Sequence, residues 1–183
     1  MREYFRSTEE RMGKIHEHFL FGDVTTGKNR MRYEEALKQA MIENKMAKNP
    51  SDIPFNALLN LVRNVQVGDP YNPSKLVMRD LRESVVKKLG LNQKTARSLG
   101  LYSAIGTPLD SKGVDVFIQW KTENGQIKIA TIDATINPRK IEEKNIKADV
   151  LVGEIPDPEE NLKLYQAFID RIADQIVMQL TRS

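Results

Sequence analysis

The sequence predicts a mixed α/β (α+β) fold in which helices precede a β-sheet and one further helix closes the chain. Three observations predict it: apolar residues recur at helical spacing through the first half, they alternate with polar residues from residue 114 onward, and helical spacing returns near the C-terminus. At 183 residues the chain is long enough for one good hydrophobic core and too short for two comfortable domains. We expect residues 1–73 to form a helical extension and residues 74–183 to form an α/β core.

Three helices are expected in the first half of the chain. The first begins near Arg32 and ends ahead of Pro50. The second covers Pro54 to Val67 and is followed by residues typical of turns. The third spans residues 74–89, and Gly90 follows it as a helix-ending residue.

Three strands and a closing helix are expected in the second half. Residues 114–121 and 127–136 alternate in polarity on either side of Asn124-Gly125, a pattern that predicts a β-hairpin. A polar helical turn follows, and residues 148–155 are typical of a more buried strand. The closing helix is expected to begin at Asp157-Pro158, because acidic residues and proline favour a helix start. Its apolar stripe comprises Leu164, Phe168, Ile172, Ile176 and Leu180.

Composition excludes several classes of protein and of site. The chain has no cysteine, so disulfide bonds, thiolate zinc sites and a cysteine nucleophile are excluded. No apolar run approaches the roughly 20 residues that span a bilayer. The N-terminus becomes charged again at Glu9-Glu10, so it lacks the apolar segment of a signal peptide. We expect a cytoplasmic protein with no membrane partner.

Charge is distributed unevenly along the chain. Residues 1–100 hold 18 Lys and Arg against 12 Asp and Glu, a net of +6, whereas residues 101–183 hold 10 against 13, a net of −3. Such asymmetry suits a protein that binds polyanions with one half and cations with the other. An unevenly charged but merely solvated surface is the alternative.

Four basic residues gather around Gly90 and are the expected nucleic-acid contacts: Lys87, Lys88, Lys94 and Arg97. The glycine lies between an apolar-faced helix and a short basic segment, as in a helix pair that reads DNA. An ordinary helical corner is the alternative, and it is favoured because the second helix would have barely two turns. The four basic residues nonetheless make DNA an expected partner, and a homodimer is left open.

Two aspartates on the predicted strands carry the strongest functional signal. Asp115 opens the first strand of the hairpin and Asp133 interrupts the second, which is otherwise apolar. A carboxylate in a half-buried strand is costly unless it is paired or binds a cation. Two of them on neighbouring strands indicate a divalent metal, which can activate water and neutralise charge on a scissile phosphate. We expect the pair to face one side of the sheet and to be partly accessible; solvent-facing or turn-capping aspartates are the alternative.

The order of these elements resembles the PD-(D/E)XK nuclease superfamily, the restriction endonuclease-like proteins with an α-β-β-β-α-β core. The matching segments are the helix 74–89, a strand near Leu101 to Gly106, the strands 114–121 and 127–136, a helical link, and the strand 148–155. By this resemblance Asp115 matches the acid of the first motif and Asp133 that of the second. Glu83 is similar to a helix-borne carboxylate that some members use, and Mg²⁺ would be the cofactor.

The sequence departs from the family at the motif lysine. The resemblance places that lysine two residues beyond Asp133, where this chain has Thr135. Lys140 is the candidate that could take over its role.

Three functions follow from these observations. The first is a metal-dependent DNA endonuclease-like phosphodiesterase, a hydrolase with Asp115 and Asp133 as magnesium ligands and Lys140 orienting or activating water. The second is a catalytically inactive relative that binds nucleic acid through the basic helical half. The third is an accessory protein of the phage or plasmid type that uses the same fold for protein contacts.

Overall fold

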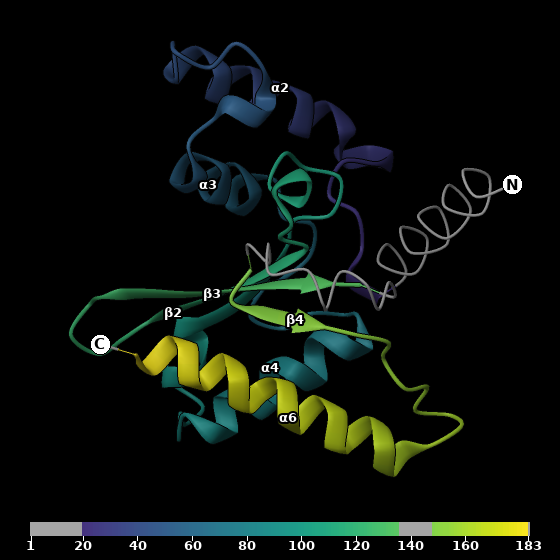
Figure 1. Cartoon of the computed structure of the whole chain (residues 1–183). Helices are drawn as coiled ribbons and strands as arrows, with labels where there is room; N and C mark the ends of the chain where they lie inside the picture. The colour runs from purple at the N-terminus through teal and green to yellow at the C-terminus, as the bar shows by residue number, and fades with distance from the viewer. Residues whose placement is uncertain (1–19, 136–147, 183) are drawn as a thin grey trace, which may run out of the picture.

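A computed structural model describes residues 20–135 and 148–182 and shows a four-stranded sheet between two layers of helices (Figure 1). Helix α3 (Phe55–Val65) lies against one face of the sheet with α2 (Arg30–Glu43) packed on it. Helices α4 (Leu76–Lys88) and α6 (Leu162–Thr181) cover the other face. The mixed α/β class predicted from the sequence is confirmed. No helix in these two stretches is long and apolar enough to cross a membrane.

The sheet is mixed, with its strands in sequence order. The strands are β1 (Leu99–Ser103), β2 (Val116–Lys121), β3 (Ile127–Ala134) and β4 (Val150–Val152), and only the β3/β4 pair is parallel. The predicted hairpin is confirmed: Gly125 takes a positive φ of 81° in the turn between β2 and β3. Strand β1 begins two residues before the strand expected at Leu101, and β4 is shorter than residues 148–155. The helical link expected before β4 falls in residues 136–147, outside the described residues.

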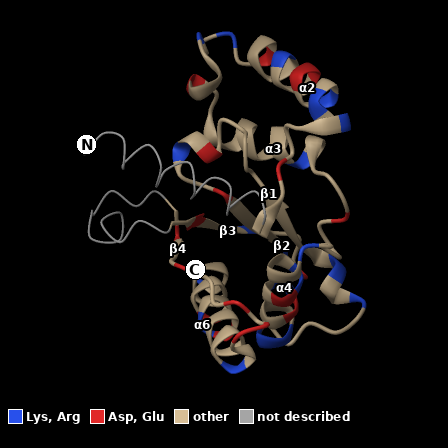
Figure 2. Ribbon diagram, turned by 90° about the vertical axis from the view of Figure 1, so that its right-hand side faces the viewer, with Lys and Arg blue, Asp and Glu red and all other residues tan. Residues whose placement is uncertain are grey.

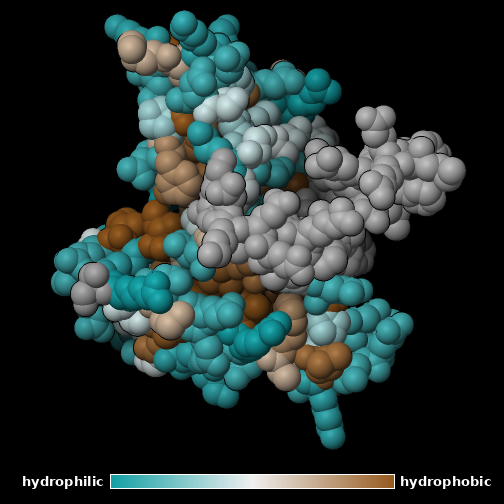
Figure 3. Space-filling view, in the orientation of Figure 1, coloured by the Kyte–Doolittle hydropathy of each residue, from teal (hydrophilic) through white to brown (hydrophobic). Residues whose placement is uncertain are grey.

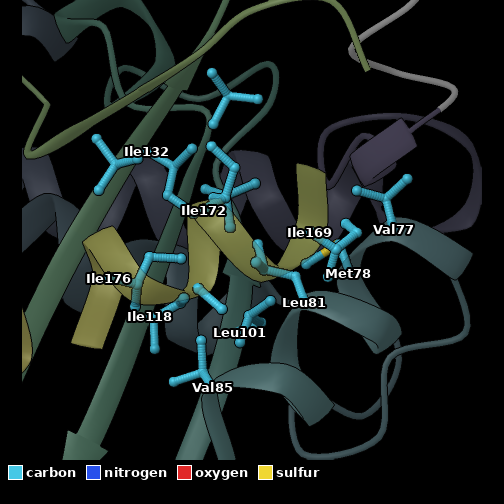
Figure 4. Close-up of a cluster of buried hydrophobic side chains, with 14 of the residues drawn as sticks. Val77, Met78, Leu81, Val85, Leu101, Ile118, Ile132, Ile169, Ile172 and Ile176 are labelled. Carbon is cyan, nitrogen blue, oxygen red and sulfur yellow. The ribbon is translucent and has the colours of Figure 1, made fainter. Parts of the chain in front are cut away.

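One hydrophobic cluster fills the space between the sheet and helices α4 and α6 (Figure 4). Every second residue of β2 and β3 enters it, as Ile118 and Ile132 do. Val85 from α4 and Ile172 and Ile176 from α6 meet them from the helical side. Full burial of each such side chain stabilises the fold by about 1.5–3 kcal/mol relative to exposure.

Helix α6 starts later than expected, and its buried stripe shifts accordingly. It begins at Leu162, where the side chain of Asn161 accepts a hydrogen bond from the backbone N–H of Leu164 (3.0 Å). The expected start at Asp157-Pro158 is wrong, because Asn161 satisfies the helix end instead. Leu164 is 55% exposed, and Tyr165 and Ile169 are buried alongside the other expected stripe residues.

Helices α4 and α6 run parallel and share a polar seam. The hydroxyl of Tyr165 donates to Asp80 Oδ2 (2.9 Å), and further along both helices Lys88 Nζ forms ion pairs with Asp170 (2.9 Å) and Asp174 (2.7 Å). Hydrogen bonds to Asp174 and Asp170 raise the pKa of Lys88. The seam sets the register between the two helices.

A second hydrophobic cluster joins the first half of the chain to the opposite face of the sheet. Leu58, Leu59 and Val62 of α3 lie in it with Tyr102 of β1 and Phe117 of β2. The side-chain oxygen of Gln66, just beyond α3, accepts a hydrogen bond from the backbone N–H of Ser103 (3.0 Å). The described part of residues 1–73 therefore shares a core with the sheet.

The segment after α4 forms a helical corner and not the second helix of a DNA-binding helix pair. The corner is the alternative that the sequence favoured. Gly90 takes a φ of 67°, and the next helical element is the four-residue 3-10 helix η3 (Thr95–Ser98). Arg82 of α4 fastens this corner by donating to the backbone oxygens of Ala96 (2.5 Å) and Leu99 (2.9 Å).

Candidate active site

Asp115 and Asp133 lie at the same end of the β2/β3 pair. Asp133 is within β3, and Asp115 immediately precedes β2. The backbone N–H of Asp115 donates to the oxygen of Ile132 (2.8 Å), and the Oδ2 atom of Asp115 accepts from the backbone N–H of Ala134 (2.6 Å). The Asp115 carboxylate therefore lies beside the peptide that links Asp133 to Ala134. The structure brings together the two acids that were paired from the sequence.

Both aspartates are buried, so the expectation that they would be partly accessible is wrong. Asp115 is 3% exposed and Asp133 is 5% exposed. The cause is the segment between β1 and β2. The backbone N–H of Ala104 donates to the oxygen of Asp115 (2.7 Å), and a Cβ atom at Gly113 would lie 3.8 Å from Asp133 Oδ2. This segment packs against the pair, a tertiary contact that strand alternation does not show.

Asp133 faces the side of the sheet that carries α3. Its neighbours Ile132 and Ala134 belong to the cluster beneath α4 and α6, so strand alternation directs Asp133 to the opposite face. Thr131, two residues earlier, is on that same face. The face that carries the candidate site is thus the one that the first half of the chain partly covers.

Thr131 and Asp149 fasten β4 to β3 next to the aspartate pair. The N–H and the hydroxyl of Thr131 both donate to Asp149 Oδ2 (2.8 and 2.7 Å), and the N–H of Asp149 donates back to the Thr131 hydroxyl (2.9 Å). Asp149 was not singled out from the sequence, although it interrupts an apolar strand as Asp133 does. Three hydrogen bonds give it a structural role at the start of β4.

The other residues predicted for catalysis lie in different places. Thr135 is buried, and its N–H continues the β3/β4 ladder by donating to the oxygen of Val152 (2.8 Å). The position that the resemblance assigns to the motif lysine is therefore inside the protein, next to the pair. Glu83 is exposed on α4 between the core residues Leu81 and Val85, so it faces away from the sheet and is not brought to the aspartates. Lys140 lies outside the described residues.

Asp115 and Asp133 are the two carboxylates that the sequence analysis expected to hold a cation. Among the residues that the structure describes, no group of three His, Cys, Asp or Glu side chains could hold a metal ion. Mg²⁺ is nonetheless bound in many enzymes through one or two carboxylates, with water and substrate phosphate as its other ligands. The hydrogen bond from Ala134 fixes the orientation of the Asp115 carboxylate. The pair, with the Asp115 carboxylate oriented in this way, fits Mg²⁺ in that mode.

The predicted basic patch around Gly90 is divided by the α4/α6 seam. Lys87, Lys94 and Arg97 are exposed. Lys88 instead forms the ion pairs with Asp170 and Asp174, so its charge is already matched by two carboxylates. On α2 basic and acidic residues are interspersed (Figure 2), and much of the surface that carries hydropathy colours in Figure 3 is hydrophilic. Three of the four residues are available for phosphate contacts.

Arg63 is a further residue of interest that was not singled out from the sequence. It is the single charged residue of α3, whose other side chains are largely apolar. Its guanidinium lies over the ring of Phe117, 5.6 Å from the ring centre, on the same face of the sheet as Asp133. A lone arginine in an apolar helix was the signal that could have drawn attention to it.

Comparisons of the chain with protein-family models, with curated proteins and with solved structures gave no match. The chemistry of the site therefore rests on its own residues.

Proposed function

We propose that this chain is a metal-dependent phosphodiesterase of the DNA endonuclease type, with Asp115 and Asp133 as its Mg²⁺ ligands. One observation carries the proposal: two buried carboxylates from adjacent strands lie at the same end of the β2/β3 pair. Carboxylate oxygens are the ligands that Mg²⁺ takes in proteins, and one or two carboxylates with water and substrate phosphate complete its coordination.

The order of the elements supports the same proposal. Helix α4 and the strands β1, β2, β3 and β4 follow one another in the order expected of an α-β-β-β-α-β core, and the second helix of that core would fall in residues 136–147, outside the described residues. Asp115, directly before β2, and Asp133, within β3, are the positions to which the resemblance assigns the acids of the first two motifs. This agreement in order is the basis for proposing hydrolysis of a phosphodiester rather than metal binding alone.

Each residue has a defined task in this proposal. A bound Mg²⁺ would activate water and neutralise charge on the scissile phosphate. Asp115, held by the Ala134 N–H, and Asp133 supply its carboxylate ligands. Lys140 would orient the attacking water in place of the lysine missing at Thr135. Lys87, Lys94 and Arg97 would bind backbone phosphates of DNA.

A cleavage assay on labelled DNA tests the proposal. The wild-type chain is expected to cut in Mg²⁺ and not in EDTA. Asp115→Asn and Asp133→Asn should each lower the rate by more than the roughly 10–100-fold that changes to outer-shell groups cost. Glu159→Gln, which removes an exposed carboxylate before α6, is the matched control and should cut as the wild type does. Cleavage that survives both aspartate substitutions would overturn the proposal.

A catalytically inactive, nucleic-acid-binding protein of the same architecture is the second candidate. The observation in its favour is Thr135, a buried threonine where the resemblance requires a lysine. This candidate predicts DNA binding that weakens steeply with salt and no cleavage in any divalent metal. The assay above separates the two.

A further inference from the structure

Arg63 holds a positive charge in a half-buried position without an acidic partner among the described residues. Among the described residues its side chain has one hydrogen-bond partner, the side-chain amide of Asn60. The Nη1 atom of Arg63 donates to Asn60 Oδ1 (2.5 Å). The Nε atom is buried and has no hydrogen-bond acceptor in the described part of the chain. Burial lowers the pKa of the guanidinium, the direction expected when a cation is taken from water without compensation.

Arg82 shows how the same chain satisfies an arginine that has only a structural role. Burial lowers the pKa of Arg82 as well, but its side chain donates to two backbone oxygens, those of Ala96 and Leu99. Within residues 20–135 and 148–182, Arg63 has no such pair of acceptors. A half-buried cation with an unused donor is costly to keep, and an anion that binds to it removes that cost.

The groups around Arg63 are suited to an anion. The hydroxyls of Tyr71 and Tyr102 lie 3.5 Å apart, and both tyrosines interact electrostatically with the guanidinium. Tyr102 stacks on Phe117 (ring centres 4.9 Å apart), the ring that also lies under Arg63. Tyr71 is 40% exposed and Asn60 is exposed, so the group is open to solvent on one side. Since Tyr102 donates its O–H to the Tyr71 oxygen, the Tyr71 O–H is the phenolic donor that is left, and with the guanidinium it matches the acceptor oxygens of a phosphate.

The position of this group relative to Asp133 suggests which phosphate it takes. Phe117 is paired with Thr131 across β2 and β3, and Asp133 is two residues beyond Thr131 on the same face. Phe117 and Asp133 are thus diagonal neighbours, about 7–8 Å apart. Because Arg63 lies over the Phe117 ring, its guanidinium is on the same face of the sheet as Asp133 and one diagonal step away along it.

We propose that Arg63, together with Tyr71, binds a phosphate group, and that this group is a backbone phosphate of a nucleic-acid strand next to the phosphodiester held at Asp133. The identity of the strand rests on the proposed function, whereas the phosphate site rests on the surroundings of Arg63 alone. A free phosphate is the other source of the same chemistry.

Salt titration of DNA binding by the full chain in EDTA tests the site without requiring catalysis. Arg63→Gln should weaken binding and reduce the slope of log affinity against log salt by about 0.9 on duplex DNA or about 0.7 on a single strand. Arg30→Gln is the matched control, because Arg30 is exposed and already paired with Glu34 (2.8 Å), and its slope should equal that of the wild type. An unchanged slope in a folded Arg63→Gln variant would overturn the proposal.

Two further arms keep the test decisive. Tyr71→Phe removes one exposed hydroxyl and should weaken DNA binding several-fold. The salt slope should not change, because the hydroxyl donor is neutral. If Arg63→Gln does not fold, unaltered DNA binding by Tyr71→Phe would overturn the proposal. Calorimetry with inorganic phosphate separates the sources. Saturable phosphate binding that disappears in Arg63→Gln while the DNA slope is unchanged would overturn the nucleic-acid assignment in favour of a free phosphate.

The two proposals fail separately. A wild-type chain that binds DNA through Arg63 and never cleaves it supports the phosphate site and contradicts the proposed hydrolysis. Cleavage that depends on Asp115 and Asp133, combined with an unchanged slope in Arg63→Gln, supports the hydrolysis and contradicts the binding of a nucleic-acid phosphate at Arg63.

Discussion

The carboxylate of Asp115 accepts a hydrogen bond from the backbone N–H of Ala134, the residue that follows Asp133 in β3 (2.6 Å). This bond links the segment before β2 to the adjacent strand at the point where both acids are buried. It gives Asp115 a structural role in addition to its proposed role as a metal ligand.

Asp115→Ala is expected to destabilise the protein even without metal. The substitution leaves the buried N–H of Ala134 without its acceptor, which costs about 1–3 kcal/mol. Asp115→Asn should cost less, because its amide oxygen can still accept the bond. Urea unfolding followed by circular dichroism measures both. Equal stabilities for the alanine and asparagine variants would mean that this hydrogen bond contributes nothing.

The ion pairs of Lys88 are expected to make the stability of the α4/α6 seam depend on pH. The hydrogen bond from Lys88 lowers the pKa of Asp170 below its ordinary 3.8, so this stabilisation is present above pH 3.8 and is lost as the pH falls through the lower folded value. The pKa of Lys88 is raised above 10.5, so its contribution is present below pH 10.5 and is lost as the pH rises through the folded value.

Melting temperatures measured across this pH range in wild type and Lys88→Met test the point. The melting temperature of the variant should fall less at the acidic and basic extremes than that of the wild type. High salt should reduce the difference in melting temperature between the two proteins, because Asp170 and Asp174 are solvent-exposed. Parallel pH profiles would show that the seam is held by its apolar contacts alone.

Thr135→Lys is expected to raise Mg²⁺-dependent cleavage. The substitution places a lysine two residues beyond Asp133, the position that the resemblance assigns to the motif lysine, and positioned proton transfer by such a group contributes roughly 10²–10⁴-fold in rate. Thr135→Met has a similar length without charge and serves as the control for packing at this buried site. Cleavage rates on one DNA substrate compare the two variants. Equal rates would show that a lysine at this position does not limit hydrolysis.

Lys87, Lys94 and Arg97 are expected to contribute to DNA binding without Lys88. Replacing the three exposed residues with glutamine should lower the salt slope on duplex DNA by about 0.9 for every phosphate that they neutralise in the wild type. Adding Lys88→Gln should change the slope little, because Lys88 is neutralised by Asp170 and Asp174. Fluorescence anisotropy at several salt concentrations gives both slopes. A large extra drop on adding Lys88→Gln would contradict this division of the patch.

The sequence predicted correctly those elements that are determined by residues close to one another in the chain. The hairpin was readable from Asn124-Gly125, and its register brings Asp115 close to Asp133, as the alternation on the two strands suggested. The start of α6 was predicted wrongly because Asp157-Pro158 and Asn161 both offer a helix start, and only packing selects Asn161.

Contacts between distant segments could not be predicted from one sequence. Lys88 meets Asp170 and Asp174 across more than eighty residues of chain, and Arg63 meets Phe117 across more than fifty. Burial of the aspartates likewise depends on the segment that contains Gly113. Such contacts require the relative placement of helices and loops, which hydrophobic periodicity does not determine.

Calorimetric titration of Mg²⁺ into the metal-free protein tests the central claim most directly. The account predicts saturable binding at one site in the wild type and in Glu159→Gln, and loss of that binding in Asp115→Asn and Asp133→Asn, with all four proteins folded by circular dichroism. Absence of Mg²⁺ binding in the wild type, or equal binding in all four proteins, would contradict it.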